Sequence, residues 1–300
     1  MSNSSVFPPE VVALLPLAIK EQPVIDAERY MSAVGFSVLV YDFLLTFGDE
    51  VRYIWRRPVT NIKVLYLFLR YGVTVAQVVY FQAISGLTTS HISHSFCVGS
   101  LIVLALVGSM SLILANYIMI IRVYTLWDHR KWMLRTLYIG YSLSVCSTIA
   151  FVATSIVQLA PHVVHDPFIF HMCLITGRSP YWIGIWLSQA LFDVFLFVLT
   201  ITNAASRPRR ANVKIITDLR RDGLVFYLGL FVGRFLNVAL SIPTDRQYYL
   251  IAVSFVLSLS TVMVTRLVLR VERLLVTRGS GRDLQVPNWM YNSYELQSAD

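Results

Sequence analysis

The sequence predicts an all-α integral membrane protein, a bundle of seven transmembrane helices with its N-terminus outside the cell and its C-terminus in the cytosol. Three observations support this fold class. Only 14% of the 300 residues are charged and 56% are apolar or aromatic, whereas soluble domains carry about 25% charged residues. The apolar residues gather in blocks long enough to cross a bilayer. The basic residues beside these blocks favour one side of the membrane.

A spanning helix needs about 20 mostly apolar residues, because each residue rises about 1.5 Å across a hydrocarbon core of about 30 Å. A spanning segment must also satisfy its own backbone hydrogen bonds, so we interpret each block as a helix. The predicted spans are Tyr30–Phe47, Val64–Ile84, Val98–Ile121, Leu137–Ala160, Tyr181–Ile201, Leu224–Ile242 and Tyr248–Leu269.

The remaining segments define the predicted domain boundaries. The apolar stretch Val11–Ile19 is too short to span a bilayer and contains Pro16, and we expect the first span to act as an uncleaved signal. Residues 1–29 are therefore predicted to form an exoplasmic segment and residues 30–270 the seven-helix domain. Residues 271–300 are predicted to be a cytosolic basic helix end with a disordered tail.

Orientation follows from the lysines and arginines beside the spans. Nineteen lie at the end of or after the first, third, fifth and seventh spans, and four lie on the other side. The net charge of +8 thus reflects a basic cytosolic face beside anionic lipid, and not a nucleic-acid-binding surface. The lipid bilayer, in particular the plasma membrane, is the predicted environment.

Two of the three cysteines fall on the predicted outer side, where a disulfide would persist. Cys97 lies at the mouth of the third span and Cys173 in the loop after the fourth. We expect a Cys97–Cys173 disulfide, with two unpaired thiols as the alternative. Cys146, inside the fourth span, is interpreted as a small buried apolar residue.

A family resemblance begins at the first span. The stretch Tyr41–Val51 (YDFLLTFGDEV) is followed by Trp55-Arg56-Arg57 and by Leu67–Tyr71 (LFLRY). Together they resemble the N-terminal signature of a large family of basidiomycete fungal membrane proteins known only by a domain of unknown function. Arg122–Trp127 (RVYTLW) resembles the element that closes that family's third helix. Members are described mostly as receptor-like or uncharacterised, so the resemblance implies a receptor-like protein.

This chain lacks the residues that several known classes of seven-helix protein need for their chemistry. All four lysines lie outside the predicted spans, which excludes a retinal Schiff base, and no histidine lies within a span to bind a catalytic zinc ion. Animal G-protein-coupled receptors of the largest class usually carry an acidic-Arg-Tyr triplet at the end of the third helix and prolines in the sixth and seventh helices. The acidic residue and these prolines are missing here. We interpret the loop histidines His91, His94, His162 and His165 as solvated, with a zinc or copper site as the alternative. No enzymatic activity, cofactor or metal is predicted.

Four ionisable residues lie well inside the predicted spans, where charge is costly and often functional. Asp42 and Arg70 lie at similar depths in the first two spans, and Asp193 and Arg234 lie near the middle of the fifth and sixth. Pairing is expected, because an unpaired buried charge costs several kcal/mol. Each pair is interpreted either as a structural contact that fixes the register of two helices or as part of the functional mechanism of the protein.

Basic residues on the predicted cytosolic side offer a docking surface for an acidic protein partner. The candidates are Arg122, Arg207, Arg209 and Arg210. The alternative is that the basic residues at the helix ends only anchor the chain to the membrane surface.

Taken together, the layout favours a receptor-like sensor of an external small molecule that signals through basic cytosolic loops. A small-solute transporter or channel that uses the intramembrane Asp/Arg pair, and a structural membrane protein, are the alternatives. A water-filled crevice that reaches Asp193 from both sides would favour transport, whereas one that opens only outward would favour sensing.

Overall fold

The structure is a computed structural model that describes residues 9–56, 60–86, 93–127, 130–166, 172–175, 177, 179–206, 214–242 and 248–280. These residues form eight α-helices, four short π- or 3₁₀-helical segments and one pair of strands. In chain order the elements are α1 (Pro9–Glu50), η1 (Val51–Trp55), α2 (Asn61–Leu67), η2 (Phe68–Gly72), α3 (Val73–Ser85), α4 (His94–Leu126), α5 (Lys131–Leu159), η3 (Ala160–His162), β1 (Val163–Asp166), β2 (Met172–Ile175), α6 (Trp182–Ser206), α7 (Lys214–Ser241), η4 (Tyr248–Leu250) and α8 (Val253–Ser280).

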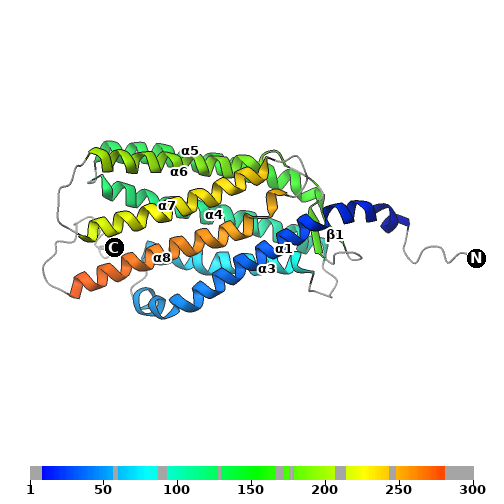
Figure 1. Cartoon of the computed structure of the whole chain (residues 1–300), viewed down its shortest axis with the longest axis horizontal. Coiled ribbons are helices and arrows are strands. Elements are labelled where there is room, and N and C mark those ends of the chain that lie inside the picture. Colours follow the sequence, from blue (N-terminus) through cyan, green and yellow to red (C-terminus); the bar gives the residue numbers. More distant parts are fainter. Residues whose placement is uncertain are drawn as a thin grey trace, which may run out of the picture.

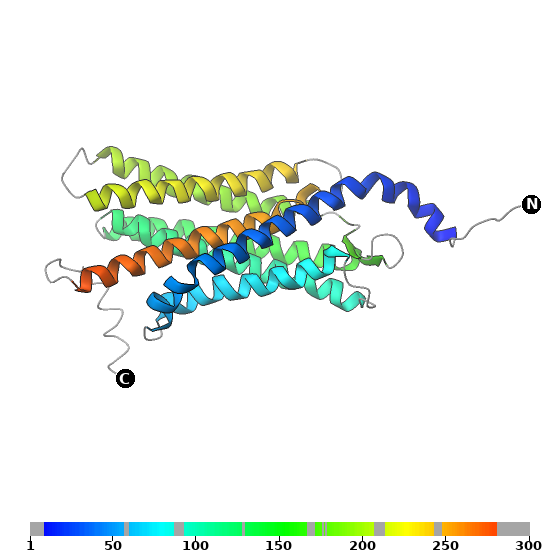
Figure 2. The same ribbon diagram turned by 60° about the horizontal axis from the view of Figure 1, so that its bottom comes forward.

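The long helices lie side by side and run along the long axis of the molecule (Figures 1 and 2). α8 packs against α1, α3, α4 and α7, while α6 packs against α4, α5 and α7. α1 runs past the β1–β2 hairpin, and its first turns extend beyond the bundle at that end (Figure 1). We call this the hairpin end. α8 ends at the other end of the bundle, which we call the opposite end.

Six helical segments of the described chain are long and apolar enough to cross a membrane, which makes this a multi-pass membrane protein. A seventh apolar segment, Leu228–Ser241 in α7, is shorter than these six. The number of spans and their orientation in the cell therefore stay predictions. The six long segments are Gln22–Trp55, Asn61–Ser85, His94–Thr125, Lys131–His162, Trp182–Asn203 and Tyr248–Arg273.

The side-chain distribution matches a lipid environment. Large apolar side chains such as Leu44, Leu143 and Val157 are 68–75% exposed, as expected of residues that face hydrocarbon. The apolar side chains of α8 are largely buried, because helices lie on several sides of it. The buried polar side chains in its first four turns are small and leave room for close helix contacts; they are Ser254, Ser258, Ser260, Thr261 and Thr265.

The helices of the structure differ in detail from the predicted spans. The first predicted span starts at Tyr30, but α1 starts at Pro9, so the predicted domain boundary after residue 29 falls inside a continuous helix. The stretch Val11–Ile19, predicted to lie outside the first span, belongs to this helix. Hydropathy locates the apolar centre of a helix, whereas its ends are set by backbone hydrogen bonding. The second predicted helix is interrupted by the π-helical segment η2, which no proline or glycine pair had indicated.

The hairpin closes one end of the bundle. β1 and β2 pair in antiparallel register, with Val163 opposite Ile175 and His165 opposite Cys173. A disulfide joins Cys173 to Cys97 at the start of α4, with the two Cα atoms 5.5 Å apart, within the normal range for such bridges. The predicted disulfide is thus formed. The predicted burial of Cys146 was wrong, because its side chain is exposed on α5; an apolar sequence context does not reveal which helix face meets lipid.

Gly35 sits where α1 crosses α8, and it supplies a direct test of this packing. A Cβ atom at this position would lie 2.9 Å from the Cα of Phe255 and 3.2 Å from the carbonyl oxygen of Ser254. Gly35→Ala is therefore expected to destabilise the bundle by about 1–3 kcal/mol, because backbone must move apart. Unfolding of the purified protein in detergent measures the loss.

The matched control is Gly48→Ala on the same helix, where a new Cβ meets nothing within 4 Å. Since alanine is the better helix former, this change should leave stability unchanged or raise it by up to about 1 kcal/mol. Equal losses for the two variants would contradict the close α1–α8 crossing.

Candidate functional site

A buried cluster of charges near the opposite end joins α1, η2 and α8, and we call it the Arg70 network (Asp42, Glu50, Arg70 and Arg266). Arg70 is 3% exposed. Its Nη1 donates to Asp42 Oδ2 at 3.2 Å. Its Nε lies 2.8 Å from Glu50 Oε2, as an ion pair rather than an aligned hydrogen bond. The guanidinium therefore bridges two buried carboxylates.

The remaining donors of Arg70 are also engaged. Nη2 donates to the Phe43 carbonyl oxygen at 3.0 Å and to Thr46 Oγ1 at 2.6 Å. Its Cζ lies 4.7 Å from the ring centroid of Phe43, a distance at which a cation is attracted to an aromatic face. The planar fork of arginine suits this many simultaneous contacts, whereas a lysine ammonium would not.

Glu50 ends α1 and is fully buried. Its Oε1 accepts hydrogen bonds from Trp55 Nε1 at 3.0 Å and from the Tyr71 hydroxyl at 2.7 Å. These two donors lie in η1 and η2, the two π-helical segments. Such segments re-aim side chains and often occur at functional sites. Here they direct Trp55, Arg70 and Tyr71 toward one carboxylate.

Arg266 of α8 donates from Nε to Asp42 Oδ1 and completes the network. The two arginines therefore balance the two carboxylates. The sequence-predicted pair Asp42 and Arg70 is in contact, but Glu50 and Arg266 were missed as its partners. Glu50 lies beyond Phe47, the end of the first predicted span, and Arg266 was counted among the basic residues of the cytosolic side. The signal that could have indicated Glu50 was its place in the sequence, ahead of Arg70 and Tyr71.

The signature residues that carry the family resemblance converge in space. Asp42, Glu50, Trp55, Arg70 and Tyr71 are joined by the contacts above, although they come from three separate elements. Tyr41, the first residue of the signature, is 63% exposed and stands outside the network. In this chain these residues therefore form one polar cluster that fixes α1 against η2.

The second predicted pair lies in a separate polar chain, which we call the Arg234 network (Asn116, Thr148, Gln189, Asp193 and Arg234). Arg234 Nη1 donates to Asp193 Oδ1 at 2.6 Å, and Nη2 donates to Asn116 Oδ1 at 2.9 Å. Asn116 Nδ2 donates to Gln189 Oε1, and Gln189 Nε2 to Thr148 Oγ1, both at 2.7 Å. This chain links α4, α5, α6 and α7, and Arg234 is fully buried.

Some polar atoms beside this chain are buried and have no hydrogen-bond partner among the described residues. They are Asp193 Oδ2, Arg234 Nε and both amide atoms of Asn237. Gln189 belongs to the hydrogen-bonded chain, whereas Asn237 is buried and its side chain bonds to none of the network. An ordered water would satisfy such groups, as is common in protein interiors.

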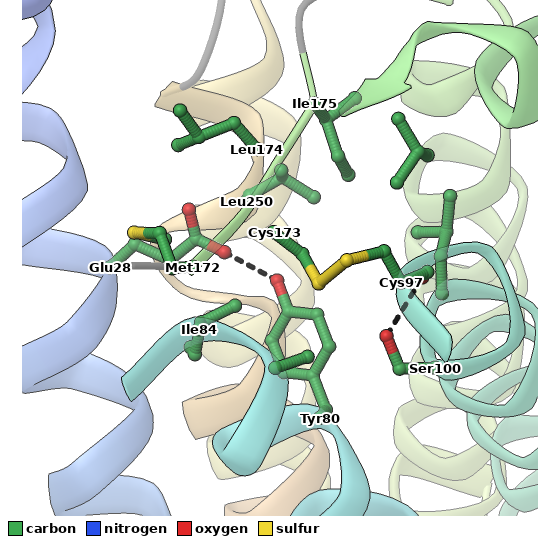
Figure 3. Close-up of a pocket in the computed structure, with 13 residues that line it drawn as sticks. Glu28, Tyr80, Ile84, Cys97, Ser100, Met172, Cys173, Leu174, Ile175 and Leu250 are labelled. Atoms are coloured by element: carbon green, nitrogen blue, oxygen red, sulfur yellow. Dashed lines mark hydrogen bonds between the residues drawn. A yellow bond between two sulfur atoms is a disulfide. The ribbon is translucent and has the colours of Figure 1, made fainter. Parts of the chain in front are cut away.

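A cavity lies under the hairpin and the disulfide, and we call it the hairpin cavity (Figure 3). It encloses about 390 Å³ between atoms, with its mouth included. Glu28 of α1 and Tyr80 of α3 form its polar side, where the Tyr80 hydroxyl donates to Glu28 Oε1. The Ser100 hydroxyl, opposite them, donates to the Cys97 carbonyl oxygen at 2.8 Å. The other lining residues are Ala83, Ile84, Leu101, Val163, Met172, Cys173, Leu174, Ile175 and Leu250.

A second cavity lies between α4, α5, α6 and α8, and we call it the indole cavity; the space between its lining atoms, open mouth included, is about 460 Å³. Trp182 and Trp186 line it and are 6% and 2% exposed. The Nε1 atom of each has no hydrogen-bond partner among the described residues. The two cavities share one lining residue, Leu101. The remaining lining residues are Leu104, Ala105, Gly108, Ser109, Leu112, Val152, Ile185, Val253 and Leu257.

The structure describes one of the four predicted cytosolic docking residues. Arg122 is half-buried, and its Nη2 contacts the Leu267 carbonyl oxygen of α8 at 3.4 Å, so it helps to hold α4 against α8. Arg207, Arg209 and Arg210 lie outside the described residues. No group of three or more histidines, cysteines or acidic residues could hold a metal ion within the described chain.

Residues 30–75 match the model of a family of unknown function (DUF6533). This range contains Asp42, Glu50, Trp55, Arg70 and Tyr71. The match therefore coincides with the part of the chain that forms most of the Arg70 network. No curated protein matches the chain.

Proposed function

We propose that this chain is a receptor-like sensor of a small external ligand, located in the plasma membrane with its hairpin end outside. The ligand would bind in the indole cavity, and a movement of α8 would carry the signal to the opposite end. The proposal includes no catalytic step. The observation that carries it is that α8 belongs to both sites, because it contributes Leu257 to the cavity and Arg266 to the Arg70 network.

The geometry of α8 supports such a coupling. Leu257 and Arg266 are nine residues apart on one continuous helix, which corresponds to roughly 14 Å along its axis. A ligand that pushes α8 at the cavity would displace the Arg266 contact with Asp42. Packed helices commonly respond to ligands by shifts of about 1–2 Å. The expected partner at the opposite end is an acidic cytosolic protein that binds the basic loops.

The indole cavity suits a compact apolar molecule with one hydrogen-bond acceptor. Its lining is almost entirely apolar, and the unpartnered indole N–H groups of Trp182 and Trp186 are the donors that an acceptor could satisfy. Cavities between bundle helices are a usual location for such sites.

The transport alternative rests on the Asp193–Arg234 pair. Neither of the two cavities is lined by Asp193 or Arg234, and the pair is closed by direct contact. These features favour sensing over transport. Solute flux into liposomes that contain the purified protein, abolished by Asp193→Asn, would favour transport instead.

Filling the indole cavity tests the coupling without knowledge of the ligand. A Cβ on Gly108, which lines the cavity, would lie 3.0 Å from Leu257 Cδ1. Gly108→Leu should therefore push α8 as a bound ligand would. Spin labels at Gly48→Cys and Arg270→Cys, in a Cys146→Ser background, report the α1–α8 spacing at the opposite end. We expect the mean distance to change by about 1–2 Å.

The control is Gly99→Leu, on the same helix but with nothing within 4 Å of its Cβ; it should leave the distance unchanged. Gly108→Ala provides a milder push if the leucine variant does not fold. A folded Gly108 variant whose α1–α8 distance equals that of the control would contradict the proposal.

A further inference from the structure

Glu28 places a carboxyl group in the wall of the hairpin cavity without an ion pair to any described residue. It lies on α1 and is only 5% exposed. Its one hydrogen bond within the described chain is the one that it accepts from Tyr80. Charged side chains at this depth are normally paired, because the loss of hydration costs several kcal/mol. None of the functions discussed above uses this group.

The nearest arginine in the sequence is committed elsewhere. Arg29 donates from Nε to the Ile84 carbonyl oxygen at 2.9 Å and from Nη2 to Met172 Sδ at 3.1 Å. Within the described residues it also forms an ion pair with Asp26, at 3.8 Å. Arg29 therefore holds α1 to the end of α3 and to β2. Among the described residues no ion pair joins it to Glu28.

The polar groups of the cavity can all accept a hydrogen bond from a cation. The Glu28 carboxylate and the Tyr80 hydroxyl lie on one side, and the Ser100 hydroxyl lies across the disulfide from them (Figure 3). Around them the lining is apolar and includes Ile84, Met172 and Leu250. This combination matches a small organic cation, whose ammonium group meets the oxygens while its carbon atoms meet the apolar wall.

Other ligand classes fit less well. A divalent metal ion needs several oxygen or nitrogen ligands, and the cavity offers a single carboxylate among apolar side chains. An anion would face that carboxylate. A large ligand would not fit a cavity that encloses about 390 Å³ with its mouth included.

We propose that the hairpin cavity is a binding site for a compact organic ammonium ion, with Glu28 as its counter-ion and Ser100 as a second acceptor. This site is distinct from the indole cavity and does not depend on the sensor mechanism. Since very small ligands gain limited free energy per atom, a probe of three heavy atoms is expected to bind in the millimolar range.

The test uses the full chain in nanodiscs, with ethylammonium chloride as the probe. Ligands that bind only the folded state raise its melting temperature. Ethylammonium should raise it in a saturable way, relative to sodium chloride at equal ionic strength. Ethanol and ethane-1,2-diol, which are similar in size and carry no charge, should have no such effect. An equal response to ethylammonium and ethanol in the unaltered protein would overturn the proposal without any variant.

Variants locate the site. Glu28→Gln keeps an acceptor for the Tyr80 hydroxyl but removes the charge, and it should weaken ethylammonium binding at least about tenfold. Ser100→Ala should weaken binding less. The matched control is Asp26→Asn, because Asp26 lies on the same helix and its side chain is 40% exposed; its response should equal that of the unaltered protein. Folded Glu28→Gln protein that binds ethylammonium as before would also overturn the assignment.

Discussion

Removal of either member of the Asp193–Arg234 pair is expected to destabilise the bundle by about 3–5 kcal/mol, because each single change leaves a buried charge without its partner. Asp193→Asn strands a fully buried guanidinium, and Arg234→Met strands a carboxylate and also the Asn116 carbonyl oxygen. The double variant contains no unpaired charge, so it should recover much of the loss. Equilibrium unfolding in detergent gives the four values of the cycle.

The coupling term of this cycle isolates the contact itself. Arg135→Met provides a control for the loss of an arginine, because Arg135 is exposed on α5; the expected change is within about 0.5 kcal/mol. Additive losses for Asp193→Asn and Arg234→Met would mean that the two groups do not share one interaction. In that case Asp193 would need a different partner, such as a transported cation.

Sequence reasoning went furthest where depth in the membrane decides the outcome. Asp42 and Arg70 were paired because they lie at similar depths in neighbouring spans, and the structure brings them within 3.2 Å of each other. The same argument paired Asp193 with Arg234, which lie 2.6 Å apart. In each case a charged group in an apolar block has very few possible partners. The cost of an unpaired buried charge therefore narrows the choice of partner.

The partners that were missed depend on rotation about the helix axis and on local backbone geometry, which depth does not reveal. Glu50 turns into the bundle because α1 continues past Phe47 and passes directly into η1. Arg266 reaches Asp42 only because α8 lies beside α1. Periodicity did not indicate that α8 is central, since all spans draw on the same few residue types. The π-helical segment η2 changes the direction in which the Arg70 side chain points, and no sequence pattern indicated this segment.

The cavities were beyond sequence reasoning for a different reason. A cavity is the volume that several helices fail to fill, so it depends on all their side chains at once. Trp182 and Trp186 were assigned only to an apolar span, and their lack of hydrogen-bond partners among the described residues became visible only in the packed bundle. Glu28 was placed in the exoplasmic segment, although α1 carries it into the wall of the hairpin cavity.

Arg70→Met is expected to produce a loss at least as large as that of the mid-membrane pair, about 3–5 kcal/mol or more. The reason is that one guanidinium serves two buried carboxylates, together with the Phe43 carbonyl oxygen and Thr46. Arg70→Lys should recover only part of the loss, since a lysine ammonium cannot span these acceptors. By contrast, Arg266→Met should cost about 1 kcal/mol or less, because its side chain is 46% exposed and Asp42 keeps Arg70.

The rescue pattern distinguishes this network from a generic loss of packing. After Arg70→Met, Asp42 still has Arg266, whereas Glu50 has no other cationic partner within the described chain. Adding Glu50→Gln should therefore restore more stability than adding Asp42→Asn, even though both remove one buried charge. The amide that Glu50→Gln introduces would also keep an acceptor for Trp55 and Tyr71. Unfolding free energies of the three variants measure the order. Equal rescue, or better rescue by Asp42→Asn, would mean that the loss of stability comes from packing around Phe43. It would then not come from the unpaired Glu50 carboxylate.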